Sequence, residues 1–252
     1  MSRNGRTDSL GSAGDDGDLA LQFIHDCSPV LATRREFAPR WDGDKSCVAL
    51  RVALSTAFGV RKIVPLLPAF LDRHPALRID LSMSDRYEDL IVEGADVALR
   101  LGRLADSSFV GRRLASARRL VVAAPSYLQR RGLPATIADL ASHDCLRAEF
   151  ETSVWKFRHG GREASVTVEP RLRTSSSVGL VACAVAGLGI AVASEWQCEE
   201  ELRSGALVSI LAQYTPDPLD VWMIFPAGRQ PARRARVFAD YLTTSFAAEG
   251  PK

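Results

Sequence analysis

Two hydroxyl-rich stretches stand immediately before segments with helical patterning, and they are the residues best suited to bind a small anion. Ser55 and Thr56 follow the apolar run 48–54, and 174–177 reads Thr-Ser-Ser-Ser before the apolar run that begins at Val178. The first turn of a helix offers unpaired N–H groups and a partial positive charge, and Ser and Thr hydroxyls add donors. The same residue types are the preferred N-caps, so helix capping is the simpler interpretation of either stretch alone.

Arg100 favours the binding interpretation because it ends the mainly apolar run 95–99. In open α/β sheets, ligands bind in the crevice beyond the carboxyl ends of the strands. A guanidinium group pairs with a carboxylate through two parallel hydrogen bonds. Two donor-rich helix starts and one arginine therefore predict a site for a small carboxylate.

Signatures of catalysis or metal binding are missing from the sequence. It contains no G-x-S-x-G, H-E-x-x-H or P-loop motif. Gly187-x-Gly189 resembles half of a dinucleotide fingerprint, but it follows a predicted helix and lacks the third glycine. The histidines are not at metal-ligand spacing; they are His25, His74, His143 and His159. We therefore predict no enzyme activity, no metal and no cofactor.

The five cysteines form no C-x-x-C pair and no Cys/His cluster with metal-ligand spacing, a pattern that a reducing cytoplasm permits. A redox-sensing pair stays open as the less favoured interpretation. The cysteines are Cys27, Cys47, Cys145, Cys183 and Cys198.

The chain as a whole has the composition of a globular protein with no strong charge bias. It has 252 residues, 46% hydrophobic and 25% charged, and a net charge of +2, which is too small for the whole molecule to be a polyanion binder. Residues 1–18 are rich in Gly, Ser and Asp and predict a disordered tail rather than a signal peptide. The uncharged stretch 174–194 begins with one threonine and three serines and contains three glycines, so we expect a helix, a turn and a buried strand there rather than a membrane span.

From Cys47 onward, strand and helix signals alternate, which predicts an α/β domain with a largely parallel sheet. Before it, 19–41 has helical spacing, interrupted by Pro29. Strands are expected at 48–54, 77–83, 95–101, 119–124, 145–148, 154–158, 164–168, 190–193, 207–211 and 219–225. Helices are expected at 60–71, 87–93, 125–131, 136–142, 178–186, 195–203 and 231–246.

Several of these segments, taken in order, resemble the effector-binding domain of LysR-type transcriptional regulators. They are LRVALS at 50–55, IVPLLPAFL followed by Pro75 at 63–75, LRIDL at 77–81, DVALRLG at 96–102, RRL at 112–114 leading to APSYL at 124–128, and GLGIA at 187–191. The resemblance covers about 47–246, and the combined order is more specific than any one piece.

The resemblance implies a two-lobed, type 2 periplasmic-binding-protein-like α/β fold with mostly parallel sheets and a preceding linker helix. Residues 1–18 would be the tail and 19–46 a remnant of the linker helix. Lobe I would contain 47–124 and 225–252, and lobe II 125–224. The chain would cross between the lobes twice and hold an effector in the cleft. By position, the cleft residues would be Ser55, Thr56, Phe58, Arg100, Gly102, Ser175, Ser176 and Ser194.

The family's N-terminal winged helix-turn-helix has no counterpart before the first strand. We therefore expect a cytoplasmic, ligand-sensing region of a LysR-family regulator that does not contact a membrane. It would bind a small, anionic effector and contact DNA only through an upstream helix-turn-helix or a partner. Homo-oligomers, or mixed oligomers with an intact regulator, would form through the 60–72 helix and the 77–83 strand. The alternative is a stand-alone binding protein for a small solute.

Overall fold

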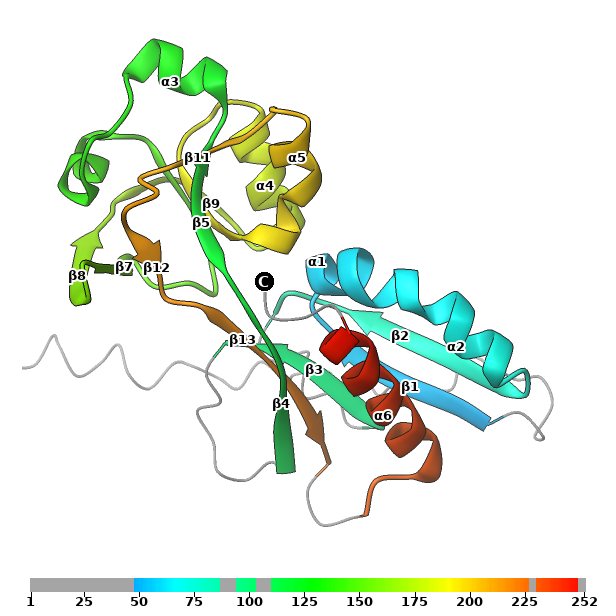
Figure 1. Cartoon of the computed structure of the whole chain (residues 1–252). Helices are drawn as coiled ribbons and strands as arrows, with labels where there is room; N and C mark the ends of the chain where they lie inside the picture. The colour runs from blue at the N-terminus through cyan, green and yellow to red at the C-terminus, as the bar shows by residue number, and fades with distance from the viewer. Residues whose placement is uncertain (1–47, 87–93, 103–109, 227–229, 249–252) are drawn as a thin grey trace, which may run out of the picture. The chain divides into compact units, whose positions relative to one another are not determined.

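The computed structural model describes residues 48–86, 94–102, 110–226 and 230–248 (Figure 1), and all of them belong to one compact unit of the chain, Glu36–Lys252. The predicted tail, the predicted linker helix and the helix expected at 87–93 lie outside the described residues. We define lobe I as the five-stranded sheet with α1, α2 and α6, and lobe II as the three smaller sheets with α3, α4 and α5.

Lobe I is built on a mixed sheet with the strand order β2-β1-β3-β13-β4. The first three strands run parallel, whereas β13 is antiparallel to both β3 and β4. The strands are β1 (Val48–Leu54), β2 (Leu77–Met83), β3 (Val97–Leu101), β4 (Val110–Ala117) and β13 (Leu219–Phe225). Alternate residues of β1 and β3, such as Leu50, Val52 and Leu99, face a buried core on one side of this sheet.

Helices α2 and α6 cover that core face, where Phe70 of α2 meets Phe238 of α6 at a ring-centroid distance of 5.2 Å. The helical segments of lobe I are α1 (Thr56–Phe58), the π-helical η1 (Gly59–Ile63), the 3-10 helix η2 (Val64–Leu66), α2 (Leu67–Arg73) and α6 (Arg233–Ala248). Pro65 and Pro68 lie in the first turns of η2 and α2, where a missing N–H group costs no hydrogen bond. The regular helix therefore begins only at Leu67.

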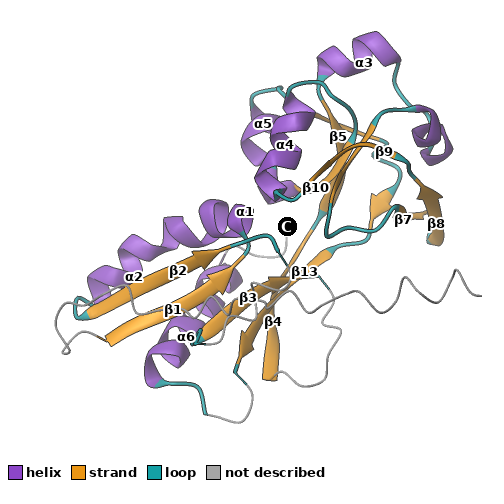
Figure 2. Cartoon of the chain, turned by 180° about the vertical axis from the view of Figure 1, so that it is seen from behind, coloured by secondary structure: helices purple, strands orange, loops and turns teal. Residues whose placement is uncertain are grey.

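Lobe II contains three small sheets with the strand orders β10-β5-β11, β12-β7-β8 and β6-β9. Its strands are β5 (Arg119–Ala123), β6 (Cys145–Ala148), β7 (Val154–His159), β8 (Arg162–Thr167), β9 (Pro170–Thr174), β10 (Ala191–Ser194), β11 (Val208–Ile210) and β12 (Thr215–Pro216). Its helices are α3 (Pro125–Arg131), η4 (Ile137–Ser142), α4 (Ser177–Val185), η5 (Glu195–Gln197) and α5 (Glu199–Arg203). As defined here, lobe II takes in β5 and leaves β13 to lobe I. Figure 2 shows α4 and α5 on one side of β10 and β5.

The expectation of mostly parallel sheets is wrong, because the sheets are mixed. β5 is antiparallel to both of its neighbours, and β7 and β8 form a hairpin. Gly160 and Gly161 close that hairpin with φ values of 56° and 78°, the left-handed conformations that a two-residue turn matching the strand twist requires. The chain also returns to lobe I through β13, which enters the first sheet against its parallel strands.

The two connections between the lobes are short and lie next to each other. Only Arg118 separates β4 from β5, and only Asp217 and Pro218 separate β12 from β13. Ala117 and Leu219, the last and first residues of their strands on the lobe I side, form a pair in the ladder. The lobes are therefore joined by a two-stranded ribbon.

Candidate functional site

Three parallel strands of lobe I end at the same edge of the sheet, and the predicted site residues follow them. Leu54, the last residue of β1, is paired with Met83 on β2 and with Leu99 on β3. Ser55 and Arg100 therefore take the next positions on neighbouring strands. This is the carboxyl-end crevice at which α/β sheets bind ligands.

The carboxylate of Asp85, two residues beyond β2, bridges the first residues of two helices. Its Oδ1 accepts a hydrogen bond from the Thr56 backbone N–H at 2.9 Å. Its Oδ2 accepts from the backbone N–H of Ser177 at 2.8 Å and from the Ser177 hydroxyl at 2.7 Å. Thr56 begins α1 in lobe I and Ser177 begins α4 in lobe II. The two helix starts that we predicted to bind a ligand carboxylate thus bind a carboxylate of the chain itself.

Two further contacts join the lobes beside this bridge. The rings of Phe58 in α1 and Trp196 in η5 meet edge to face, with centroids 5.4 Å apart. Arg61 in η1 pairs with Glu200 at 2.9 Å and with Glu201 at 2.8 Å, both in α5. The hydrogen bond to Glu200 is the main reason that the pKa of Arg61 is raised above its ordinary value. In both views α1 lies beside α4 (Figures 1 and 2).

The structure brings Ser55, Thr56 and Arg100 to one edge of the sheet. Ser55 is buried, at 7% exposure, and its hydroxyl oxygen has no hydrogen-bond partner among the described residues. Arg100 is also buried, at 4%, and stands opposite Trp222 of β13 in the ladder. Strand alternation places the Arg100 side chain on the sheet face of Ala98, away from the α2–α6 core.

Phe58 and Gly102 have structural roles at the same edge. Phe58 is buried in the core of lobe I, where it contacts Phe246 as well as Trp196. Gly102 has a φ of 98° and donates its N–H to the carbonyl of Asp220 at 2.8 Å. A side chain at Gly102 would be strained by that φ rather than by its surroundings.

The three predicted serines of lobe II lie at helix starts or face solvent. Ser176 is the N-cap of α4, because its hydroxyl accepts the N–H of Gly179 at 3.1 Å, as the capping interpretation requires. Ser175 is exposed. Ser194, at the end of β10, is 1% exposed and donates its N–H to Gln197 at 2.8 Å.

Sequence reasoning missed Asp85, and it included Ser177 only in the hydroxyl-rich stretch 174–177 and not among the cleft residues. The signal for Asp85 was its place just beyond the strand 77–83, the same argument that selected Arg100. The signal for Ser177 was its place as the last hydroxyl residue before the apolar run. The residue that begins a helix has an unpaired N–H group. Neither residue type distinguishes a bridge between two distant helices from an ordinary cap.

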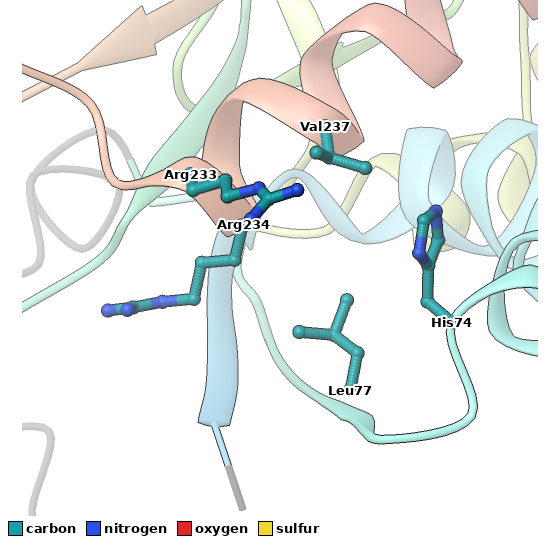
Figure 3. Close-up of a pocket in the computed structure, with 5 residues that line it drawn as sticks. All are labelled: His74, Leu77, Arg233, Arg234 and Val237. Carbon is teal, nitrogen blue, oxygen red and sulfur yellow. The ribbon is translucent and has the colours of Figure 1, made fainter.

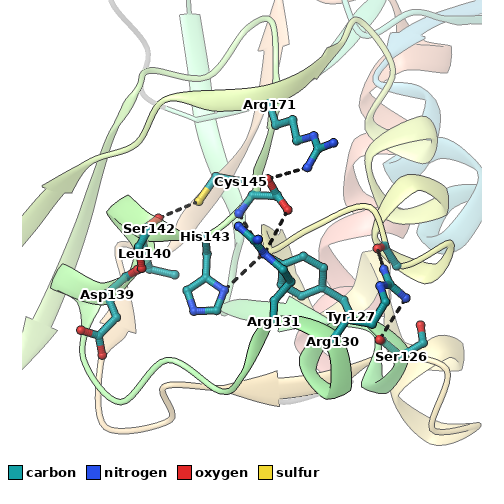
Figure 4. A network of polar contacts seen from close by, with 12 residues as sticks. Ser126, Tyr127, Arg130, Arg131, Asp139, Leu140, Ser142, His143, Cys145 and Arg171 are labelled. Carbon is teal, nitrogen blue, oxygen red and sulfur yellow. Dashed lines mark hydrogen bonds and ion pairs between the residues drawn. The ribbon is translucent and has the colours of Figure 1, made fainter.

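A cationic cavity in lobe II is an alternative location for an anion (Figure 4). It has a volume of about 350 Å³, and Tyr127, Arg130, Arg131, Asp144 and Arg171 are among the residues that line it. Asp144 pairs with Arg171 at 2.9 Å and with Arg131 at 3.6 Å, while Arg130 donates to the carbonyls of Ser126 and Gly187. These cations already have acceptors, so the network is structural.

The same network explains the glycines at 187 and 189. The N–H of Asp144 donates to the Tyr127 hydroxyl at 2.8 Å, and burial is the main reason that the pKa of Tyr127 is raised. A Cβ at Gly189 would lie 2.2 Å from the carbonyl oxygen of Asp144. Gly189 therefore allows a close approach of two backbone segments, and Gly187 has a φ of 71°, which favours glycine.

A second cavity, of about 400 Å³, lies at the opposite end of β2 (Figure 3). It is lined by His74, Leu77, Arg233, Arg234 and Val237. Leu77 begins β2, so a seven-residue strand, about 20 Å in length, separates this cavity from the Asp85 bridge. It therefore takes no part in the candidate site.

The two buried cysteines are poor nucleophiles, and the described residues contain no metal-binding cluster. Burial raises the pKa of both Cys145 and Cys198 to about 12, so that neither is a thiolate at neutral pH. No group of three His, Cys, Asp or Glu side chains in the described ranges is placed to hold a metal ion. Among the helices described here, none combines the length and apolar character needed to cross a membrane.

Comparisons with known proteins agree with this fold. Residues 45–247 match the LysR substrate binding domain family. The regulator DmlR of Escherichia coli is 28% identical over 205 residues, which cover 80% of this chain and 66% of that protein. An uncharacterized HTH-type transcriptional regulator of Haemophilus influenzae is 31% identical over 182 residues, which cover 71% of this chain and 63% of that protein. The chain thus spans slightly less than two thirds of these relatives.

Solved structures show the same fold. The regulatory domain of CrgA, a LysR-type transcriptional regulator from Neisseria meningitidis, is 28% identical with a TM-score of 0.69, and the match covers 79% of this chain and 99% of that domain. The regulatory domain of AphB from Vibrio vulnificus, at 23% identity and a TM-score of 0.66 over 78% of this chain and all of that one, supports the fold. The expected periplasmic-binding-protein-like α/β fold is confirmed, and the named relatives are regulators, not enzymes. This chain belongs to the LysR family and carries its substrate-binding domain.

Proposed function

We propose that this chain is the effector-sensing region of a transcriptional regulator and that it binds a small anionic metabolite, a carboxylate, between α1 and α4. The effector would shift the two lobes between an open and a closed arrangement. That shift would be passed to DNA by a helix-turn-helix outside residues 48–248, either on the same polypeptide or on a partner.

One observation carries this proposal: the first amides of α1 and α4 both donate to a single carboxylate. The donors Thr56 N, Ser177 N and Ser177 Oγ all lie 2.7–2.9 Å from the Asp85 oxygens. Helix N-termini favour negative charge, and hydrogen bonds to an ionised acceptor are about twice as strong as neutral ones. Buried Arg100 on the adjacent strand end adds a positive charge to the same edge.

Thermal shift against a panel of mono- and dicarboxylates tests the proposal, with the corresponding amides as neutral controls. We expect carboxylates, but not amides, to raise the Tm of the wild-type chain. Arg100→Gln, which keeps most of the side-chain volume, should abolish the shift. Arg113→Gln is the matched control, because Arg113 is an exposed residue of β4 that pairs with Asp220 at 3.3 Å. Equal shifts in the two variants would remove Arg100 from the site.

We also propose that the chain self-associates, or joins an intact regulator, through η1 to α2 and β2. β2 is an edge strand of its sheet, and Val60 and Val64 are large apolar residues that are 50% and 41% exposed. Exposed edges and apolar side chains are typical of surfaces that pair with another chain. Analytical ultracentrifugation of the wild type and of Val60→Lys should show a larger species only for the wild type.

A gel-shift assay with the purified chain should show no DNA binding at physiological salt.

A further inference from the structure

We infer that the Asp85 carboxylate is an internal competitor for the effector: it occupies the donors that an effector carboxylate would use and holds the lobes together until it is displaced. This inference rests on the proposed function, because it names how that same site is regulated. Asp85 then determines both the resting arrangement of the lobes and the effector concentration at which they respond.

The three hydrogen-bond donors around Asp85 are all used by its one carboxylate. Each carboxylate oxygen accepts at least one hydrogen bond, and the three donors come from both lobes at 2.7–2.9 Å. An effector carboxylate that makes the same contacts must first remove Asp85, since these three donors cannot serve two carboxylates at full strength.

The chemistry of the donors makes such an exchange feasible. The three donors to Asp85 are two backbone amides and one hydroxyl, none of which carries a charge. When one carboxylate replaces another, the same hydrogen bonds are remade and no cation among these donors is left unpaired. Leaving the donors of Ser177 empty would be unfavourable, because Ser177 is buried and a buried donor without an acceptor is destabilising.

The position of Asp85 in the chain gives it an advantage over a free anion. Asp85 is held two residues beyond β2, whose seven residues are all paired with β1. A tethered group competes at an effective concentration that is typically in the millimolar range. Removing it should therefore strengthen the binding of a free anion by about tenfold or more.

A purely structural role for Asp85 makes the opposite prediction. If Asp85 served only to connect α1 and α4, its loss would disorder the donors and weaken anion binding. The two interpretations therefore differ in the sign of the change in anion affinity, and a measurement of stability alone would not separate them.

The first experiment compares the wild type with Asp85→Asn and Asp85→Ala in the absence of added anions. The ¹⁵N–¹H signals of Thr56 and Ser177 report the bridge, and 5-fluorotryptophan labelling gives a ¹⁹F signal of Trp196 that reports its contact with Phe58. In both Asp85 variants we expect all of these signals to shift. Asp139→Asn is the control, because Asp139 also binds two backbone amides, of Ala135 and Thr136, but entirely within lobe II. The inference is overturned if the Trp196 signal stays unchanged in both Asp85 variants.

The second experiment titrates formate, which is the group that Asp85→Ala deletes, with formamide as the neutral control. We expect Asp85→Ala to bind formate at least about tenfold more tightly than the wild type, and saturating formate to return the Trp196 signal to its wild-type position. Circular dichroism confirms that the variant is folded, and Asp85→Asn, which keeps the side-chain shape, provides an independent variant.

The outcomes separate this inference from the proposed function. Equal formate affinity in the wild type and in Asp85→Ala would overturn the competitor role and leave the proposed anion site standing. Formate binding by neither protein, together with a shifted Trp196 signal in the variant, would overturn the anion site and the displacement, while Asp85 would remain the bridge between the lobes.

Discussion

Asp85 and Asp96 are two carboxylates at opposite ends of the same parallel strands, and their partners differ in kind. Asp96, just before β3, accepts the N–H of Arg51 at 2.9 Å and binds the guanidinium of Arg234 at 2.9 and 2.6 Å. Asp85, just after β2, accepts only uncharged donors from the described residues, one from lobe I and two from lobe II. Asp96 therefore connects elements within lobe I, whereas Asp85 connects the two lobes.

The difference indicates which carboxylate can be exchanged. The Asp96 side chain is 13% exposed and that of Arg234 is 34% exposed, so loss of the carboxylate leaves a half-buried cation without its partner. Breaking such a pair costs more than breaking a neutral hydrogen bond. Loss of Asp85 leaves dipoles that another anion can satisfy. A permanent structural contact and a replaceable one thus differ in the charge of the donor, although both look like well-bonded aspartates.

The largest effect is expected for Asp96→Asn. It should lower the free energy of unfolding by about 2–3 kcal/mol, because Arg234 loses its bidentate partner. Urea denaturation measures this change. Asp240→Asn is the control, since Asp240 is 78% exposed and lies 3.6 Å from Arg112; it should change stability by less than about 0.5 kcal/mol. Equal losses in the two variants would contradict the ranking.

Asp85→Asn should lower the free energy of unfolding by less, about 1–2 kcal/mol, because it weakens hydrogen bonds without leaving a cation unpaired. The sharper comparison uses the alanine variants and the ¹⁹F signal of Trp196, whose ring contacts Phe58 across the lobes. This signal should shift in Asp85→Ala and return with formate, whereas Asp96→Ala should leave it at its wild-type position with or without formate. An equal shift in both variants would remove the distinction between the two aspartates.

Arg61→Met tests the exposed ion pair that also joins the lobes. Arg61 is 36% exposed and its partners Glu200 and Glu201 are 64% and 19% exposed, so solvent screens the interaction. We expect a loss of less than about 1 kcal/mol that disappears at high salt. Urea denaturation of the wild type and the variant at low and high NaCl measures both quantities. A salt-independent loss would mean that Arg61 acts through packing.

The smallest change in stability is expected at Asp139, which binds backbone amides only within lobe II. The N–H groups of Thr136 and then Ala135 hold the pKa of Asp139 below its usual value of 3.8. Because the folded pKa is lowered, the stabilisation is present above the usual pKa and is lost as the pH falls below it toward the folded value. Wild type should therefore exceed Asp139→Asn in stability at neutral pH, with the difference closing in acid. A difference that persisted in acid would contradict this origin.

Most of the regular elements could be predicted from the sequence, because their apolar residues follow one period. The strands 77–83, 145–148 and 219–225 and the helix 125–131 are observed with the predicted bounds. β4 and β9 were missed, since exposed arginines interrupt their patterns. Arg112 and Arg113 in β4 and Arg171 and Arg173 in β9 face solvent, and edge strands keep such residues without losing their pairing.

The candidate site could be predicted only in part. Helix starts and strand ends are local signals, and they brought Ser55, Thr56 and Arg100 to the same edge of the sheet. The bridge from Asp85 to Ser177 joins residues that are 92 positions apart, and no local pattern encodes such a contact. The mixed sheets were also missed because they depend on contacts distant in sequence. The direction of β13 in the lobe I sheet depends on where the chain returns from lobe II, and the residues of β13 do not encode it.

The ribbon that joins the lobes limits how they can move. Ala117 pairs with Leu219 immediately before the crossings, and the backbone between the strands consists of Arg118 on one side and of Asp217 with Pro218 on the other. The carbonyl of Arg118 also accepts the N–H of Glu195, and proline restricts φ at 218. The opening that we propose would therefore depend on the few backbone torsions of these two connections. A substitution that makes them more flexible, such as Pro218→Gly, would change the rate and the range of opening, while the contacts that decide between the open and closed states would remain.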